Sequence, residues 1–239
     1  MNFRKAPERG FLTIRENIAR VRERIDQAAG RAGRRPETIR LVVVCKTVEV
    51  ERIRQAIGAG AQILGENYVQ EAQKKIAVLG EEVDWHFIGH LQTNKVKLAV
   101  RLFRMIHSVD KLNLARELNR AALQQGAVLP VLLQISLSGE MTKFGAGEEE
   151  ALAFAGQMAE MKGLHVQGLM TMPPFFEDPE ASRPYFVRLR KLAESLAQQK
   201  IPGISMEELS MGMSNDFEVA VEEGATLIRV GTAIFGPRL

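Results

Sequence analysis

The stretch LVVVCKT, residues 41–47, is a run of five apolar residues that ends on a lysine. A short continuous apolar run predicts a strand that is buried on both of its faces. Lysine is rarely buried unless its charge has an outlet or a partner. Lys46 is therefore either a side chain that reaches solvent or an amine that is held in a pocket to react.

Outward from this stretch, short β-rich runs alternate with longer helical patterns along the chain. Strands are predicted at residues 39–46, 61–67, 83–90, 105–110, 129–138, 164–172, 207–214 and 226–231. Helices are predicted at residues 48–60, 68–80, 94–103, 111–126, 148–161, 183–199 and 215–224, and an extra amphipathic helix at 11–33 precedes the first strand. The strands are mostly apolar throughout, which predicts a parallel sheet covered on both faces.

Eight β/α units of roughly 30 residues each match a closed (β/α)8 TIM barrel, whose usual size is about 250 residues. The chain has 239 residues, and no Ser-, Gly- or Pro-rich linker divides it. We therefore predict an α/β protein with a single barrel domain over residues 1–239. An open, doubly wound sheet is the alternative.

The composition of the chain argues against several classes of function. The 32 basic and 29 acidic residues are spread out, and the densest basic patch, residues 30–37, contains no aromatic side chain. Nucleic-acid binding is therefore not expected. The single Cys45 excludes an internal disulfide framework, and the four histidines lack a metal-ligand spacing. No signal-peptide core and no apolar run of about 20 residues is present, which predicts a cytoplasmic protein without a membrane span.

In a parallel barrel, functional residues lie where strands end and the following loops begin. Polar or small residues do gather at the predicted strand ends. They are Lys46, Glu66, Asn67, His90, Gln92, His107, Ser108, Ser210, Ser214, Gly231 and Thr232. This clustering was not used to assign the strands, so it supports a site at that end of the barrel.

The last two loops have the features of a phosphate site. Residues 210–216, SMGMSND, include Gly212, which permits close backbone approach, and Ser214, which we expect to N-cap the helix at 215–224. Residues 231–236, GTAIFG, offer the amides and hydroxyl of Gly231 and Thr232. Either loop alone is better explained as an ordinary cap or turn. Both together, after strands seven and eight of a barrel, predict bound phosphate.

A buried amine and a phosphate site together indicate a ligand that carries an aldehyde and a phosphate, as pyridoxal 5′-phosphate (PLP) does. Burial disfavours the ammonium form of Lys46, and the neutral amine attacks carbonyl groups. Arg229 lies two residues before Gly231, on the same face of its strand. It could meet an anion, or face the ring nitrogen of a pyridine cofactor and keep it unprotonated. Alternatively, Arg229 pairs with a core carboxylate such as Glu208 or Glu66.

With these residues in place, the chain resembles the pyridoxal phosphate homeostasis protein family, which is related to the N-terminal barrel of alanine racemase. The resemblance is carried by VCKT at 44–47, GENYVQE at 65–71, WHFIGHLQTNK at 85–95, TKFG at 142–145, GLMTM at 168–172 and the long segment at 208–236. The family often has serine before the lysine, where this chain has Cys45. Strand alternation is expected to point Cys45 away from the pocket.

The resemblance implies PLP in Schiff-base linkage to Lys46, with Arg229 near the pyridine nitrogen. It implies phosphate contacts from Met213 and Ser214, and from Gly231 and Thr232. The strand-end residues Asn67, His90 and Ser210 complete the expected cofactor-binding set.

Family members are regarded as cofactor carriers or regulators without an established reaction. A racemase needs a second base, a tyrosine that the resemblance places in an additional C-terminal domain. The sequence ends at Leu239 after the eighth predicted strand, and its two tyrosines, Tyr68 and Tyr185, do not match that motif. We therefore expect a monomeric, non-catalytic protein that carries or buffers PLP, with PLP-dependent apoenzymes as partners. The alternatives are a low-activity PLP-dependent amino-acid racemase and a cofactor-free Schiff-base aldolase or phosphosugar isomerase.

Overall fold

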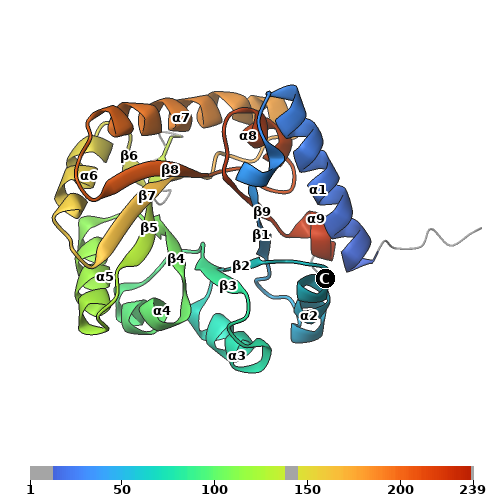
Figure 1. The fold of residues 1–239 in the computed structure, drawn as a ribbon, viewed down its shortest axis with the longest axis horizontal. Helices are drawn as coiled ribbons and strands as arrows, with labels where there is room; N and C mark the ends of the chain where they lie inside the picture. The colour runs from blue at the N-terminus through green and yellow to red at the C-terminus, as the bar shows by residue number, and fades with distance from the viewer. Residues whose placement is uncertain (1–12, 138–144, 238–239) are drawn as a thin grey trace, which may run out of the picture.

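The computed structural model describes residues 13–137 and 145–237, and its strands form a closed parallel barrel (Figure 1). The eight barrel strands are β1 Arg40–Val44, β2 Ile63–Glu66, β3 Asp84–Phe87, β4 Met105–Val109, β5 Leu129–Ser136, β7 Leu164–Met170, β8 Ile204–Ser210 and β9 Leu227–Val230. Strand β9 pairs with β1 and strand β4 pairs with β5, so the ring closes. The predicted (β/α)8 barrel is confirmed, and the open-sheet alternative is wrong. A two-residue strand, β6 Ala146–Gly147, adds to β5.

The helices surround the ring of strands on its outside (Figure 1). They are α1 Ile14–Arg31, α2 Val50–Gly58, α3 Val69–Leu79, α4 Val96–Leu102, α5 Leu112–Gln124, α6 Ala151–Ala159, α7 Arg183–Gln198, α8 Phe217–Glu222 and α9 Thr232–Phe235. Three single-turn 3-10 helices, η1 Pro36–Thr38, η2 Thr93–Lys95 and η3 Pro179–Ser182, precede β1, α4 and α7. Among the described residues, no helix has both the length and the hydrophobicity needed to cross a bilayer.

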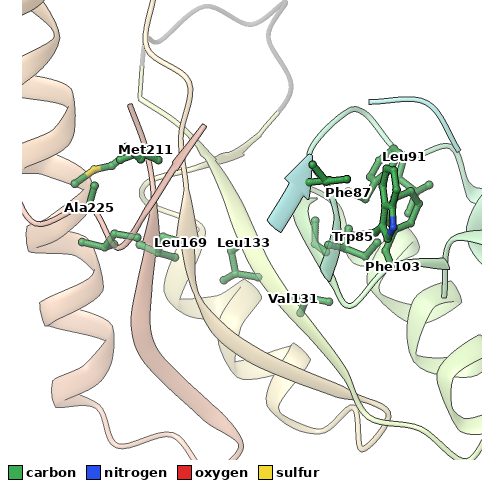
Figure 2. Packing of buried hydrophobic residues seen from close by; sticks show 14 of the residues in the cluster. Trp85, Phe87, Leu91, Phe103, Val131, Leu133, Leu169, Met211 and Ala225 are labelled. Atoms are coloured by element: carbon green, nitrogen blue, oxygen red, sulfur yellow. The ribbon is translucent and has the colours of Figure 1, made fainter. Parts of the chain in front are cut away.

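Alternation along the strands divides the core into two parts. The inner part fills the barrel with one side chain from each of six strands: Val42, Ile63, Met105, Leu132, Met170 and Leu227. The outer part lies between strands and helices, where Figure 2 shows Trp85, Phe87, Leu91 and Phe103 packed together. The rings of Phe87 and Phe103 meet edge to face at 5.1 Å. Cys45 belongs to the outer part, as strand alternation predicts.

Helix α1 is the extra N-terminal helix that the sequence predicts. Thr13 and Glu16 form a capping box at its start, so the amides of these two residues have acceptors. Its apolar stripe, which includes Ile18 and Val21, is buried against α8, α9 and α2. Residues 11 and 12 of the predicted helix lie outside the described residues.

Three local predictions at the end of the chain are corrected. Strand β8 begins at Ile204, three residues before the predicted start at 207. The loop predicted at 231–236 contains helix α9. Ser214 does not N-cap α8, because the N-cap is Asp216. The TKFG motif at 142–145 lies, apart from Gly145, outside the described residues, and the single domain over residues 1–239 stays a prediction.

Candidate functional site

Lys46 lies in a tight turn immediately after β1. The amide of Val48 donates to the carbonyl of Cys45 at 3.0 Å, which closes the turn around Lys46 and Thr47. Lys46 is half-buried, and Thr47 has a φ of 60°. Burial raises the pKa of the Cys45 thiol well above its usual range, so the neighbouring sulfur stays protonated. This turn therefore carries the amine that the sequence predicts as the PLP anchor.

Arg229 is a buried cation inside the barrel. It pairs in register with Val42 of β1 and lies on the same strand face as Leu227 of the inner core. Its guanidinium donates to Ser210 Oγ at 2.6 Å and to the carbonyl of Thr171 at 2.9 Å. Burial lowers the pKa of Arg229 to about 10, so the group remains charged at neutral pH.

The alternative partners of Arg229 bind other cations. Glu208 pairs with Arg40 at 2.5 Å, and Glu66 pairs with Lys75 at 2.6 Å. A guanidinium carries five N–H donors, of which Ser210 and Thr171 take two. Arg229 can therefore still donate to a ligand atom that accepts hydrogen bonds, such as a pyridine nitrogen.

A hydrogen-bonded chain continues from Arg229 across the barrel interior. Ser210 Oγ lies 2.9 Å from His107 Nδ1, and His107 Nε2 lies 3.0 Å from His86 Nδ1. A guanidinium only donates hydrogen bonds, so the Ser210 hydroxyl accepts one from Arg229 and can donate one to His107. Burial lowers the pKa of His86 to about 3 and also lowers that of His107, so both rings are neutral near pH 7. Arg229 is thus the charged end of an otherwise neutral chain.

The loops that follow β8 and β9 lie side by side, as a phosphate site requires. Ser214 Oγ accepts from the amide of Ala233 at 3.3 Å, and the carbonyl of Gly212 accepts from the amide of Arg229 at 3.0 Å. Gly212 has a φ of 87°, and a Cβ there would lie 2.5 Å from that of Ala220. Only glycine fits this position. Ser214 and Thr232, the residue before Ala233, therefore lie at one corner of the barrel.

Asp216 organises the loop after β8 from inside. Its carboxylate accepts from the amide of Met213 at 2.7 Å and from the hydroxyl of Ser182 at 3.0 Å. Because the Met213 amide is used within the loop, a phosphate contact through it requires that hydrogen bond to be given up. Ser214 is the better-placed donor of the two predicted residues.

On the β2 and β3 side, Asn67 and His90 line one pocket of about 480 Å³. Other residues of its wall are Tyr68, Gln92, Lys95, Gln134 and Met172. Lys46, Arg229 and the phosphate-loop residues are not among those that line it. The predicted site residues thus fall into two groups: the β1, β8 and β9 group with Lys46, and the pocket group with Asn67 and His90.

Buried polar atoms at the barrel mouth lack partners in the described structure. Asn67 Oδ1, Ser108 Oγ and Asp110 Oδ2 are buried oxygens for which the described residues supply no hydrogen bond. They follow or end strands β2 and β4. His90 Nδ1 lies 3.9 Å from Asp110 Oδ2, beyond hydrogen-bonding distance. Orphaned buried acceptors of this kind are expected where a ligand or ordered water binds.

Sequence reasoning missed three parts of this region. Thr171 acts through its carbonyl, and any residue type offers one, so nothing in the sequence marks it. Asp216 could have been found as a residue type that favours helix N-caps. Lys75 and Glu71 stand four residues apart on α3, the spacing of a helical ion pair, and that signal was available.

A closed (β/α)8 barrel with a lysine after β1, a buried arginine on β9 and hydroxyls after β8 and β9 is an alanine-racemase-like barrel. The family model of the alanine racemase N-terminal domain matches residues 14–238, and the chain belongs to that family. Within it, the chain is similar to the pyridoxal phosphate homeostasis proteins. That of Aquifex aeolicus is 45% identical over 224 residues, covering 93% of this chain and 97% of the relative. That of Pseudomonas aeruginosa PAO1 is 42% identical over 230 residues, covering 95% and 96%.

Solved structures agree with this grouping. PipY of Synechococcus elongatus PCC7942, solved with PLP bound, superimposes with a TM-score of 0.83 at 36% identity, covering 94% of this chain and all of PipY. An alanine racemase of Clostridium difficile 630 has a TM-score of 0.74 at 16% identity and supports the fold alone. The chain spans 57% of that racemase.

Proposed function

We propose that this protein binds PLP at the C-terminal mouth of the barrel and carries or buffers it. The observation that carries the proposal is the placement of Arg229 on β9, of Lys46 just after β1, and of Ser214 and Thr232 after β8 and β9, which are adjoining strands of the barrel. Relatives at 45% and 42% identity are named pyridoxal phosphate homeostasis proteins, and PipY was solved with PLP bound.

The donor set fits this cofactor. Ser214 and Thr232 offer hydroxyl donors for a phosphate, and Arg229 offers N–H donors to a ring nitrogen. Lys46 is the covalent anchor, through a Schiff-base linkage at Nζ. When bound, PLP supplies a reactive aldehyde and an electron-withdrawing ring. A charged arginine beside the ring nitrogen keeps that nitrogen unprotonated, which makes the ring a weaker electron sink.

A non-catalytic role agrees with the residues around the mouth. Tyr68 is 57% exposed, and Tyr185 lies on α7 with its ring 5.9 Å from that of Phe176. Neither is held as a buried second base. The alternative, a low-activity amino-acid racemase, rests on Tyr68 and His90 lining the same pocket, where either could move a proton.

The binding proposal is tested on purified protein by absorption and by borohydride fixation. Wild-type protein should take up PLP and, after reduction, carry one cofactor on the peptide that contains Lys46. Lys46→Ala should lose the adduct, whereas the control Lys74→Ala, exposed on α3, should keep it. An adduct that persists in Lys46→Ala would refute the anchor.

The racemase alternative is tested separately. Incubating the PLP-loaded protein with L-amino acids in deuterated water should give no α-proton exchange above that of PLP alone. Exchange that disappears in a Tyr68→Phe variant would establish the racemase instead. We also propose that the protein delivers PLP to PLP-dependent apoenzymes, that it is a monomer, and that it is located in the cytoplasm.

A further inference from the structure

Lys75 is a buried lysine that the proposed binding site does not use. It is 6% exposed, on helix α3, and its Nζ makes three hydrogen bonds of 2.6 Å. The acceptors are Glu66 Oε1, Glu71 Oε1 and the backbone carbonyl of Cys45. An ammonium has three N–H donors, so every donor of Lys75 is satisfied.

The charges of this cluster hold one another in place. Glu66 is fully buried, and the side chain of Glu71 is 26% exposed. Burial alone would lower the pKa of Lys75, but its hydrogen bonds to Glu66 and Glu71 raise it above its usual value. Lys75 is therefore a permanent cation, and removing it would leave a buried carboxylate uncompensated.

The cluster grips the backbone on both sides of Lys46. Lys75 binds the carbonyl that precedes Lys46, and Glu71 Oε1 accepts from the amide of Thr47, which follows it, at 2.6 Å. Glu66 reaches the next loop as well, because its Oε2 accepts from the amide of Asn67 at 3.2 Å. Both peptide groups that flank the Lys46 Cα are thus tied to one ionic cluster.

The backbone that the cluster binds is strained at Thr47. Thr47 has a φ of 60°, a left-handed conformation that β-branched residues rarely adopt. Its hydroxyl donates to the carbonyl of Lys46 at 2.6 Å. Such a conformation persists only where the surroundings over-determine it, and here Glu71 and Lys75 supply those surroundings.

We propose that Lys75 and Glu71, braced by Glu66, are positioning residues that fix the turn at Lys46 and so aim its amine at the cofactor aldehyde. The inference rests on the proposed function, because it takes Lys46 to be the PLP anchor. It assigns a role to an ionic cluster that lies between the ends of β1 and β2 and helix α3.

A positioning role predicts a loss of capture rate without a loss of non-covalent affinity, and a merely structural role does not. In the covalent capture of PLP, the neutral Nζ of Lys46 forms a C=N bond to the aldehyde carbon, and the aldehyde oxygen leaves as water with the two amine protons. Loosening the turn should slow this step, because small misplacements of a reacting group reduce rates by up to about 100-fold. It should not change the non-covalent binding of a ligand that lacks the aldehyde. Pyridoxine 5′-phosphate is such a ligand, since it keeps the ring and the phosphate.

The first test compares Glu71→Ala with Glu71→Gln. The glutamine keeps an oxygen that can accept from Thr47 and Lys75, and the alanine does not. Capture of PLP, followed by absorbance and by borohydride fixation, should slow about tenfold or more in Glu71→Ala and recover to within about threefold in Glu71→Gln. The affinity for pyridoxine 5′-phosphate should stay within about twofold in both variants, as it should in the control Lys74→Met.

A second variant covers the case in which Glu71→Ala does not fold. Glu66→Gln combined with Lys75→Met removes both charges of the buried pair together, and the same loss of capture rate is expected. If Glu71→Ala or the double variant folds and captures PLP at the wild-type rate, the positioning role is overturned. Wild-type protein that never links PLP to Lys46 would refute the proposed function instead, so the two failures are distinguishable.

Discussion

At the residue scale, the hydrogen-bonded chain inside the barrel carries its positive charge on Arg229. Arg229 remains protonated, while His107 and His86 are held neutral by burial. Protonating either ring would place a second cation in the same hydrogen-bonded chain. The two histidines are therefore acceptors and donors that orient Ser210 and Arg229, and they should make the fold sensitive to acid.

His86 gives a measurable form of this sensitivity. Its folded-state pKa is about 3, below the unfolded value of about 6.5, so the unfolded chain binds more protons between these limits. Stability therefore rises with pH through this window and is lost as pH falls. Between pH 7 and pH 5 the contribution is about 2 kcal/mol. In His86→Gln, the difference in unfolding free energy between these two pH values should shrink by about that amount, as measured by urea denaturation.

An unchanged difference between pH 7 and pH 5 in His86→Gln would contradict the burial argument. His107→Gln is the second variant. It should reduce the acid sensitivity in the same direction, because the pKa of His107 is also lowered by burial.

At the element scale, the barrel strands could be predicted because each is a short apolar run between helical patterns. Lys46 and Arg229 were predictable for the same reason, since each interrupts such a run. Two of the corrected predictions depend on contacts between distant segments. Strand β8 begins early because Val166 of β7 pairs with Ile204, and Ser214 binds the amide of Ala233 instead of capping α8. Helix α9 has only four residues, too few for a helical period to show.

Asp216, at the start of α8, connects this helix to the loop after β8 and to η3 through hydrogen bonds, and we predict that its removal destabilises the fold. Its buried carboxylate accepts from Met213 and Ser182. Asp216→Ala leaves a partly buried amide and a buried hydroxyl unsatisfied and should lower the unfolding free energy by about 2 kcal/mol. Asp216→Asn keeps an acceptor for the Met213 amide and should lose less than half of that. Thermal or urea unfolding measures both.

The neighbouring Asn215 supplies the control for Asp216. It is exposed, and its side chain donates to the carbonyl of Phe176 at 2.9 Å. Asn215→Ala should cost no more than about 0.5 kcal/mol, as exposed substitutions usually do. Equal losses in Asp216→Ala and Asn215→Ala would contradict a special role for the buried carboxylate.

At the scale of the whole molecule, α1 lies over the part of the barrel where the chain closes on itself. Strand β9 pairs with β1, and α1 packs across α8, α9 and α2 beside that seam (Figure 1). Asn17 donates to the carbonyl of Ile234 at 2.9 Å, and Arg34 donates to that of Val221 at 2.6 Å. Helix α1 and the segment that follows it thereby hold the last two helices, α8 and α9, and α9 begins at the proposed phosphate contact Thr232.

If the closed ring is one cooperative unit, a cavity under α1 should destabilise strands that α1 does not touch. Ile18 is 1% exposed, and Ile18→Ala should lower the unfolding free energy by about 2–4 kcal/mol. Trp85, the only tryptophan of the sequence, lies buried on β3 and reports on that strand. Its fluorescence transition in urea should shift by the same amount as the circular-dichroism transition. The exposed Arg20→Ala on the same helix should move neither by more than about 0.5 kcal/mol. Separation of the two transitions in Ile18→Ala would instead show that α1 and the β1–β9 seam open independently of the rest of the barrel.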